Sequence, residues 1–385
     1  MNIKHLRLKN WRNFRHVDIP LSDREFIVGP NASGKSNLLD VFRFLRDIAK
    51  QEGGGLQKAM ADRGGMSKLR CLSARKEPEI VIDIELGDGS DDAVSWRYEL
   101  GIAQEQRGHR QVFVAFERVW ENGKQILDRP NKADQGDSER LKQTYLEQVN
   151  ANKDFREISR YLSAITYLHI VPQLLRYPEI FQAAVVEHDP FGQGFLERVA
   201  KMPEKTRNAR LKIIEKALRI AVPQLKELGF EREASSGRPH LKALYSHWRP
   251  NAGWQREDQF SDGTLRLIGL LWSLLDGESL LLIEEPELSL NAGITRHLAG
   301  LIHRMQRRRR RQVFITTHSE TLLSDPGIDG AEVIMLQPGA EGTQAEVAST
   351  ISDVKQLLEA GLPAGEVVMA RTRSAGASQL EMFDD

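Results

Sequence analysis

Apolar residues alternate with polar ones at the start of the chain. This pattern predicts two strands within residues 1–28, the first around Ile3, Leu6 and Leu8 and the second at 26–28. We expect the two strands to be joined through Trp11, Phe14 and a turn at Pro20. The spacing then changes to that of an amphipathic helix, which we expect to run to about Lys50.

Later stretches switch between the spacing of strands and that of helices. Strand-like runs at 80–86, 94–102 and 111–120, separated by glycine-rich turns, predict an antiparallel meander. Helical spacing follows from 138 to about 164 and from 203 to about 228, and 230–254 reads as a hairpin or an irregular connection. The last third alternates helix and strand, at 264–275, 280–284, 295–308, 312–316 and 333–336. We therefore expect an α/β fold.

A glycine-rich turn joins the second strand to the first helix. It reads GPNASGKS from Gly29 to Ser36 and fits the P-loop pattern G-x-x-x-x-G-K-[ST] in the strand–loop–helix context that the pattern requires. Glycines let backbone N–H groups point at phosphate oxygens, and the new helix adds the positive end of its dipole. Lys35 is expected to reach the β- and γ-phosphates of ATP, and Ser36 to bind Mg²⁺. The alternative is a surface turn without a ligand. The residues expected to hold the nucleotide here are Gly29, Pro30, Asn31, Ala32, Ser33, Gly34, Lys35, Ser36 and Asn37.

A second cluster of chemistry-bearing residues lies far down the chain. The apolar run 280–283 ends abruptly in Glu284 and Glu285, as expected of a buried parallel strand at the Walker B position. Glu284 is expected to hold Mg²⁺ and Glu285 to polarise the water that attacks the γ-phosphate. By itself such a run is equally consistent with a strand followed by an acidic turn, but the P-loop strengthens the catalytic interpretation.

Two further stretches flank this strand. Ser261, Asp262 and Gly263 open the helix 264–275, where Ser261 and the Gly263 amide are expected to face an anion. The apolar run 313–317 ends at His318, a candidate sensor of the γ-phosphate; the alternative is a structural histidine.

The order of these four stretches resembles the ABC-type ATPases, in the branch that contains RecF, the SMC heads and the OLD-family ATPases. Residues 8–14, LKNWRNF, resemble the N-terminal strand and turn of RecF-like proteins, and IEEPEL at 283–288 resembles the OLD-like form of Walker B. The resemblance implies an ABC-ATPase head with a P-loop parallel sheet core, an antiparallel β subdomain and a helical insertion. It also implies that Ser261, Asp262 and Gly263 of one copy complete the ATP site of another, so that ATP closes a homodimer.

The sequence departs from the family pattern at several positions. Asp262 stands where transporters have glycine and Glu284 where most members have aspartate, and both variants resemble the OLD-like branch. Residues 288–291 occupy the D-loop position. No Q-loop glutamine is assigned: Gln173 is a candidate, and an ordinary residue entering a helix after Pro172 explains it equally well. About 65 residues follow His318, and their acids do not form the cluster of a Toprim nuclease domain, so we expect any nuclease to be a separate chain.

Composition limits the kinds of partner and the cellular location that we expect for this protein. The 54 basic and 54 acidic residues give zero net charge, so any contact with nucleic acid must come from local patches. A single cysteine, Cys71, excludes an intramolecular disulfide framework. The chain starts without the apolar segment of a signal peptide and has no membrane-spanning run, so we expect a cytoplasmic protein with no membrane contact.

The expected division of the chain is 1–127 for an N-terminal ATPase lobe with the β meander and 128–255 for the helical insertion and hairpin. Residues 256–370 are expected to form a C-terminal ATPase lobe with the signature, Walker B and histidine stretches, and residues 371–385 a disordered tail.

Two weaker signals concern partners. Five consecutive arginines end a predicted helix, where they either solvate the helix end or contact DNA phosphates. They are Arg307, Arg308, Arg309, Arg310 and Arg311. The C-terminus resembles the short peptide that docks on the bacterial sliding clamp, with packing against the protein's own surface as the alternative. Its matching residues are Gln379, Leu380, Met382 and Phe383.

These expectations favour an ATPase that dimerises around ATP and Mg²⁺ and acts as a slow switch. We expect it to be the ATPase subunit of a bacterial anti-phage defence system that works with a separate nuclease or toxin. One alternative is a RecF-like DNA repair or replication factor, which the clamp-like tail favours. The other is a non-catalytic nucleotide-sensing scaffold, against which Lys35, Glu285 and His318 count.

Overall fold

Two units share the chain, and the first is built from both of its ends. A computed structural model describes residues 1–74, 77–88, 93–105, 110–177, 191–192, 194–249 and 253–372. Unit 1 comprises Met1–Ile165 and Gln312–Asp385, and unit 2 comprises Thr166–Arg311. The clamp-like residues 379–383 lie outside the described residues.

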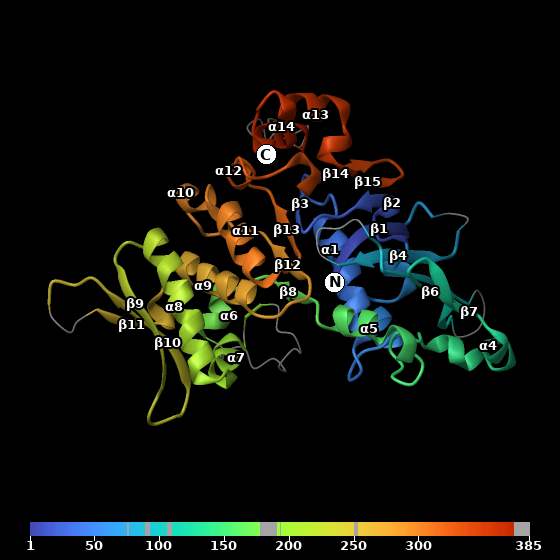
Figure 1. Cartoon of the computed structure of the whole chain (residues 1–385), viewed down its shortest axis with the longest axis horizontal. Coiled ribbons are helices and arrows are strands. Elements are labelled where there is room, and N and C mark those ends of the chain that lie inside the picture. Colours follow the sequence, from blue (N-terminus) through green and yellow to red (C-terminus); the bar gives the residue numbers. More distant parts are fainter. Residues whose placement is uncertain are drawn as a thin grey trace, which may run out of the picture. The chain divides into compact units, whose positions relative to one another are not determined.

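Unit 1 combines an antiparallel sheet, a mainly parallel sheet and covering helices (Figure 1). Its strands are β1 (Asn2–Trp11), β2 (Phe14–Pro20), β3 (Arg24–Val28), β4 (Ile80–Gly87), β5 (Trp96–Gln104), β6 (Val112–Glu121), β7 (Lys124–Arg129), β13 (Val313–Thr317), β14 (Val333–Gly339) and β15 (Gly342–Val347). Its helices are α1 (Lys35–Ala49), α2 (Leu56–Ala61), α3 (Met66–Leu69), α4 (Lys132–Gly136), α5 (Arg156–Ser163), α12 (Glu320–Leu323), α13 (Ser352–Glu359) and α14 (Ala364–Thr372).

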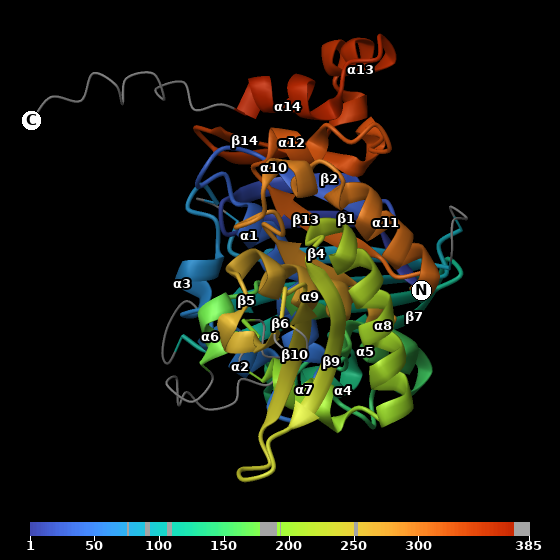
Figure 2. The same ribbon diagram turned by 90° about the vertical axis from the view of Figure 1, so that its left-hand side faces the viewer.

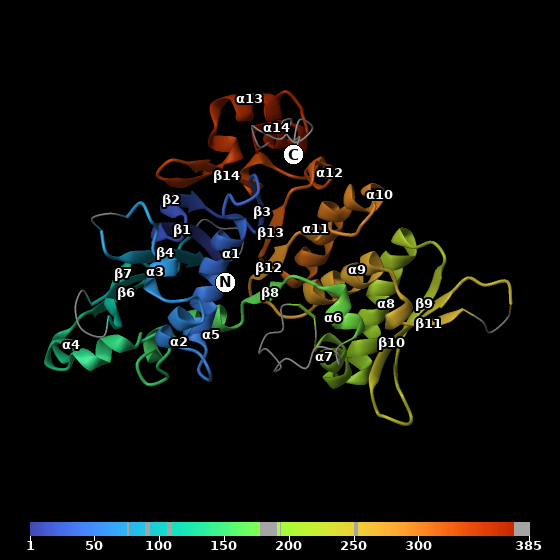
Figure 3. The ribbon, with the colours of Figure 1, turned by 180° about the vertical axis from the view of Figure 1, so that it is seen from behind.

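The antiparallel sheet has the strand order β2-β1-β4-β5-β6-β7 and contains the predicted meander. Figure 3 shows α4 beyond the β6–β7 hairpin at one end of this sheet. The prediction of two strands in residues 1–28 was incomplete, because β2 forms between them and pairs with β1 through Leu8 and Val17. Val17 and Ile19 are buried while His16 and Asp18 are exposed, which is the alternation that a half-buried strand requires.

The parallel sheet carries the P-loop. Within unit 1, β3 pairs in parallel with β13 on one side and β14 on the other, and every residue of β3 is buried. A strand buried on both faces is expected at the centre of such a sheet. Helix α1 packs on it through Phe42, whose ring centroid lies 5.1 Å from that of Phe314 in β13. The mixed α/β fold with a P-loop parallel sheet and an antiparallel sheet is confirmed.

The helix predicted from 138 to 164 is wrong over most of that range. The segment before α5 contains two short 3₁₀ helices, Ser138–Lys142 and Lys153–Phe155, and the α-helix itself is limited to Arg156–Ser163. The backbone N–H groups of Tyr145 and Leu146 instead donate to the buried Glu117 carboxylate, at 2.7 and 3.0 Å. Since these donors are used by a side chain from β6, they are not available for helical hydrogen bonds.

Unit 2 contains a small antiparallel sheet, β11-β10-β9, and a parallel strand pair, β12 with β8. Its strands are β8 (Thr166–Leu168), β9 (Leu225–Arg232), β10 (Pro239–Tyr245), β11 (Trp254–Arg256) and β12 (Leu281–Glu284). Its helices are α6 (Pro172–Arg176), α7 (Phe195–Lys201), α8 (Glu204–Ala221), α9 (Asp262–Leu275), α10 (Ala292–Thr295) and α11 (Leu298–Arg309).

Helix α8 is shorter than the predicted 203–228. It ends at Ala221 because Pro223 follows, which forces Val222 out of the helical conformation, to φ −131° and ψ 83°. Strand β9 then begins at Leu225 and forms the predicted hairpin with β10.

A buried carboxyl group in the central strand makes the fold sensitive to pH. Glu25 in β3 is fully buried, its Oε1 accepts from the Ser22 N–H, and its Oε2 has no hydrogen-bond partner. Burial raises the pKa of Glu25 from 4.5 to about 8. The unfolded state therefore loses this proton before the folded state does, so we expect the contribution of Glu25 to stability to fall as pH rises from about 4.5 to about 8.

We expect Glu25→Gln to reduce this fall in the free energy of unfolding, by on the order of 3–5 kcal/mol across that pH range. Urea unfolding at a series of pH values measures the difference from the parent. Glu346→Gln, on an exposed residue of β15, is the matched control. Equal pH slopes in the parent and Glu25→Gln would show that Glu25 does not titrate in this way.

Candidate nucleotide-binding site

The P-loop connects β3 to α1, and the side chain of Lys35 folds back onto the backbone of the loop. Lys35 is the first residue of α1, only 8% of it is exposed, and its Nζ donates to the carbonyls of Gly29 at 3.0 Å and Pro30 at 3.1 Å. Gly34 has φ +100°, and a Cβ there would lie 2.2 Å from the Asn13 side chain. Only glycine fits this position, so the loop conformation depends on it.

Asn13 and Thr343 brace the same loop from outside. Asn13 Nδ2 donates to the Ser33 carbonyl at 2.8 Å and to Thr343 Oγ1 at 2.7 Å, while its Oδ1 accepts from Asn37 Nδ2 at 2.7 Å. Thr343 Oγ1 in turn donates to the Ser33 carbonyl at 2.9 Å. The sequence analysis named Asn13 only as part of the stretch 8–14 that resembles RecF-like proteins, and it did not predict a role for Thr343. No local pattern links these two residues, which are 330 positions apart.

A buried charge cluster anchors the helix that follows the loop. The Asp40 carboxylate in α1 accepts from Arg12 at 2.5 and 3.1 Å and from Arg63 at 3.0 to 3.1 Å. Burial by itself would raise the pKa of Asp40, but the Arg63 and Arg12 guanidinium groups outweigh burial and hold that pKa below its ordinary value. Asp40 is therefore ionised at neutral pH and ties α1 to the turn after β1.

His318 lies at the same edge of the parallel sheet as the P-loop. Val28 and Thr317 are register partners in the parallel strands β3 and β13, so Gly29 and His318 leave neighbouring strands at the same level. His318 is half-buried, and Ser319 after it caps α12 by accepting from the Leu322 N–H at 3.1 Å. Of the predicted site residues, the structure thus brings His318 and the P-loop together within unit 1.

The acidic strand end belongs to unit 2. Glu284 ends β12, and Glu285 follows in the left-handed region with φ +44°. The Glu284 Oε1 atom is buried without a hydrogen-bond partner, and Oε2 lies 3.7 Å from Nδ1 of His169, which follows β8. A carboxylate oxygen without a donor suits a cation, so Glu284 fits the predicted metal-binding role. Sequence reasoning missed His169, because only the pairing of β8 with β12 reveals it.

The signature residues are tied into unit 2. Ser261 caps α9 by accepting from the Thr264 N–H at 3.2 Å, and a Cβ on Gly263 would lie 2.6 Å from the Ser289 carbonyl oxygen. Arg176 Nη2 donates to Asp262 at 2.7 Å, and Gln173 Nε2 to the same carboxylate at 3.4 Å. The Q-loop candidate Gln173 therefore contacts the signature segment.

One of the five arginines, Arg311, fits neither alternative, because it is neither solvated at the helix end nor open to DNA phosphates. Arg311 is 1% exposed, and its guanidinium donates to the backbone carbonyls of Ser273, Asp276 and Ser279 around the end of α9. Carbonyl groups at a helix C-terminus carry partial negative charge, which favours a buried cation there. Arg307 to Arg310 are exposed at the end of α11.

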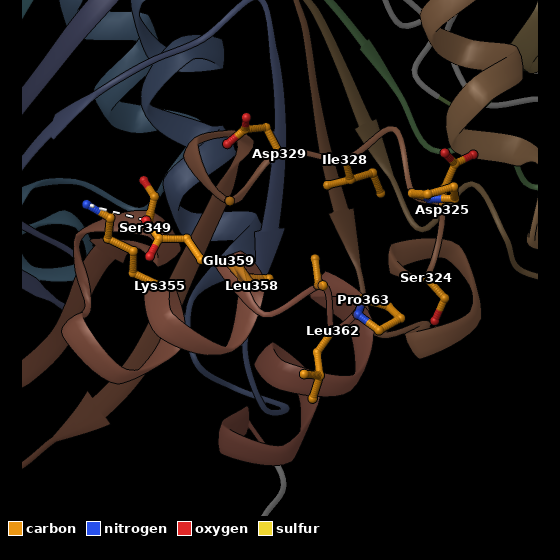
Figure 4. A pocket seen from close by; sticks show the side chains of 14 residues that line it. Ser324, Asp325, Ile328, Asp329, Ser349, Lys355, Leu358, Glu359, Leu362 and Pro363 are labelled. Carbon is orange, nitrogen blue, oxygen red and sulfur yellow. Dashed lines mark ion pairs between the residues drawn. The ribbon is translucent and has the colours of Figure 1, made fainter.

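A separate hollow of about 460 Å³ lies in the C-terminal part of unit 1 (Figure 4). Its lining includes the acids Asp325, Asp329 and Glu359, with Lys355 beside Glu359 at 3.9 Å. None of the predicted site residues lines it.

Comparison with known proteins identifies the family of the chain. A protein-family model described as "AAA domain, putative AbiEii toxin, Type IV TA system" matches residues 26–325. No curated protein matches the sequence. In the described part of the chain, no helix is long and apolar enough to cross a membrane.

Solved structures of SMC heads resemble the fold. One is an SMC head bound to the C-winged helix domain of ScpA, with a TM-score of 0.53 and 16% identity over 90% of this chain and 98% of that chain. The SMC head domain of Thermotoga maritima has a TM-score of 0.48 and 16% identity, over 90% of this chain and 99% of that one. The Pyrococcus furiosus head with an extended coiled coil, bound to the C-terminal domain of ScpA, gives 0.49 and 16%, over 94% and 99%.

Proposed function

We propose a function on the basis of the family of this chain, which belongs to the AAA domain family described as putative AbiEii toxin of a type IV TA system. In this proposal the P-loop ATPase works as a slow ATP-driven switch. The observation that supports this best is the P-loop itself. Its lysine is held at the loop carbonyls, and His318 emerges from the neighbouring strand at the same sheet edge.

In this proposal each predicted residue has one role in binding or hydrolysing ATP. Lys35 and the amides of residues 29–37 bind the phosphates, and His318 contacts the γ-phosphate. Glu285 accepts a proton from the attacking water. Ser36 and Glu284 are the residues that would hold Mg²⁺, which supplies charge stabilisation to the phosphates when it is bound.

We propose that the closed state is a homodimer with ATP between the subunits. Ser261, Asp262 and Gly263 would then face the nucleotide of the partner subunit. Each surface would provide half of the contacts to the γ-phosphate, so hydrolysis would weaken the dimer. The restraint of Asp262 by Arg176 supports this, since a pre-ordered signature segment loses less entropy on binding.

The family description names a toxin of a toxin–antitoxin system, which supports a role in bacterial anti-phage defence. We propose that the ATP-bound dimer acts on a separate nuclease or toxin chain. One SMC head of similar fold is bound to a domain of another protein, and this also supports a protein partner.

The test is the mass of the protein in solution with and without ATP. We expect Glu285→Gln to bind ATP, to hydrolyse it at least about a hundredfold more slowly than the parent, and to elute as a dimer in light scattering. The parent without nucleotide is expected to be a monomer. A Glu285→Gln protein that turns over ATP at the parent rate would refute the role of Glu285, and a monomer in every nucleotide state would refute the ATP-closed dimer.

A further inference from the structure

Helix α8 carries a stripe of exposed cations on the side that faces away from the core. Lys205, Lys212, Lys216 and Arg219 are all exposed. At 100° per residue they fall within an arc of about 60°, and at 1.5 Å per residue they extend over about 21 Å. The opposite side of the helix is buried through Leu211, Ile214 and Leu218 and packs against β9 and α9.

This stripe has one sign of charge. The other two basic residues of α8 are engaged within unit 2, Arg207 over the Phe230 ring and Arg210 with Asp276 at 2.8 Å. In the part of the chain that the structure describes, Lys205, Lys212 and Lys216 have no ion pair. Arg219 pairs with the buried Glu215 at 2.9 Å and donates to the Lys226 carbonyl, so it is engaged within unit 2 as well. Lys212 and Lys216 repel each other at i and i+4, whereas solvated surfaces usually interleave both signs. The stripe is therefore suited to an extended polyanion.

A second feature lies near the C-terminal end of the same helix. Trp248, in the loop after β10, is 78% exposed. Its ring stacks on His247 at a centroid distance of 5.6 Å, and the Arg249 guanidinium lies 4.4 Å from its centroid. The Ser246 N–H donates to the Gln224 carbonyl at 2.7 Å, which places this loop beside the segment that leaves α8, and Figure 2 shows α8 alongside β9 and β10.

An exposed tryptophan with cations beside it is the arrangement on which unpaired bases stack. A duplex would offer phosphates to the α8 stripe but would keep its bases stacked inside. We propose that α8 and residues 246–249 form a binding surface for single-stranded nucleic acid. Lys205, Lys212 and Lys216 bind phosphates, and the indole of Trp248 stacks on a base. This activity goes beyond the ATP switch and is tested without nucleotide.

The experiment is fluorescence anisotropy with labelled single-stranded DNA and RNA of about 20 nucleotides and with the matching duplex, at several salt concentrations. We expect the parent to bind the single strands more tightly than the duplex, with an affinity that falls as salt rises. The double variant Lys212→Glu with Lys216→Glu is expected to bind at least about tenfold more weakly, and its salt slope to be smaller by about 1.4 because two phosphate contacts are lost.

Two further variants make the result specific. Arg307→Glu with Arg308→Glu makes the same charge change on α11 and is expected to leave affinity within about twofold of the parent. Trp248→Ala is expected to lower single-strand affinity about fivefold or more while duplex affinity stays unchanged. Melting temperatures verify that each variant is folded. The proposal is overturned if the parent binds none of the probes, if the α8 variant binds like the parent, if both charge-reversal variants weaken binding equally, or if Trp248→Ala affects neither probe.

Discussion

Lys35→Ala is expected to lose ATP binding, by at least about a hundredfold in affinity, and with it all measurable turnover. The lysine is the cation that the P-loop directs at the β- and γ-phosphates, and alanine leaves that negative charge without a partner. Its Nζ already lies at the Gly29 and Pro30 carbonyls, so only a small movement would bring it to a phosphate. Calorimetric titration with ATP measures the affinity.

The control for this variant is Lys58→Ala, on an exposed lysine of α2 that pairs with Asp62 at 2.7 Å. It is expected to bind ATP as the parent does. Because Lys35 is buried, the melting temperature without nucleotide must also be compared, so that a loss of binding is not a loss of folding. Unchanged ATP affinity in a folded Lys35→Ala protein would remove the P-loop from the mechanism.

Arg129→Met is expected to destabilise unit 1 by about 3–5 kcal/mol. The Arg129 guanidinium is fully buried and donates to Glu117 at 2.8 Å and to Asp134 at 3.0 Å, as well as to the carbonyls of Arg140 and Gln143. Methionine fills much of the same volume but removes the cation that pairs with the buried Glu117 carboxylate, and it leaves Asp134 with only the Arg140 guanidinium at 3.3 Å. Urea unfolding at neutral pH measures the change.

Arg118→Met is the matched control, because the same substitution falls on the neighbouring strand of the same hairpin. Arg118 pairs with Glu99 and Asp128 at 3.2 Å each, but it is only half-buried, with 38% of its side chain exposed, so its loss is expected to cost less than about 1 kcal/mol. Similar losses in the two variants would mean that the Arg129 ion pairs do not stabilise the meander.

The features that could be predicted from the sequence are those that lie within one continuous stretch. The P-loop, the apolar run to Glu284 and the start of α9 each combine a strand or helix pattern with a turn, and local patterns are sufficient to specify them; α9 was predicted from 264 and begins at Asp262. The meander was predictable for the same reason, since its strands follow one another along the chain.

The features that could not be predicted depend on contacts between distant residues. His169 meets Glu284 only because β8 pairs with β12, and Glu117 takes the backbone donors of Tyr145 and Leu146 from another part of the chain. Arg311 follows four exposed arginines and has the same side chain, but the left-handed turn at Arg310 ends α11 and directs the chain inward. The hydrophobic periodicity of a segment and the helix or strand propensities of its residues contain no information about contacts with residues distant in the sequence.

The bracing of the P-loop by Thr343 has a consequence for the order of events during synthesis. The loop lies within the first forty residues to leave the ribosome, but the threonine that holds its Ser33 carbonyl is made 310 residues later. At 5–20 residues per second this delay is on the order of 15–60 s. A nascent or prematurely terminated chain would therefore hold the P-loop through Asn13 alone, and the second brace would form only when the strand that carries Thr343 is made.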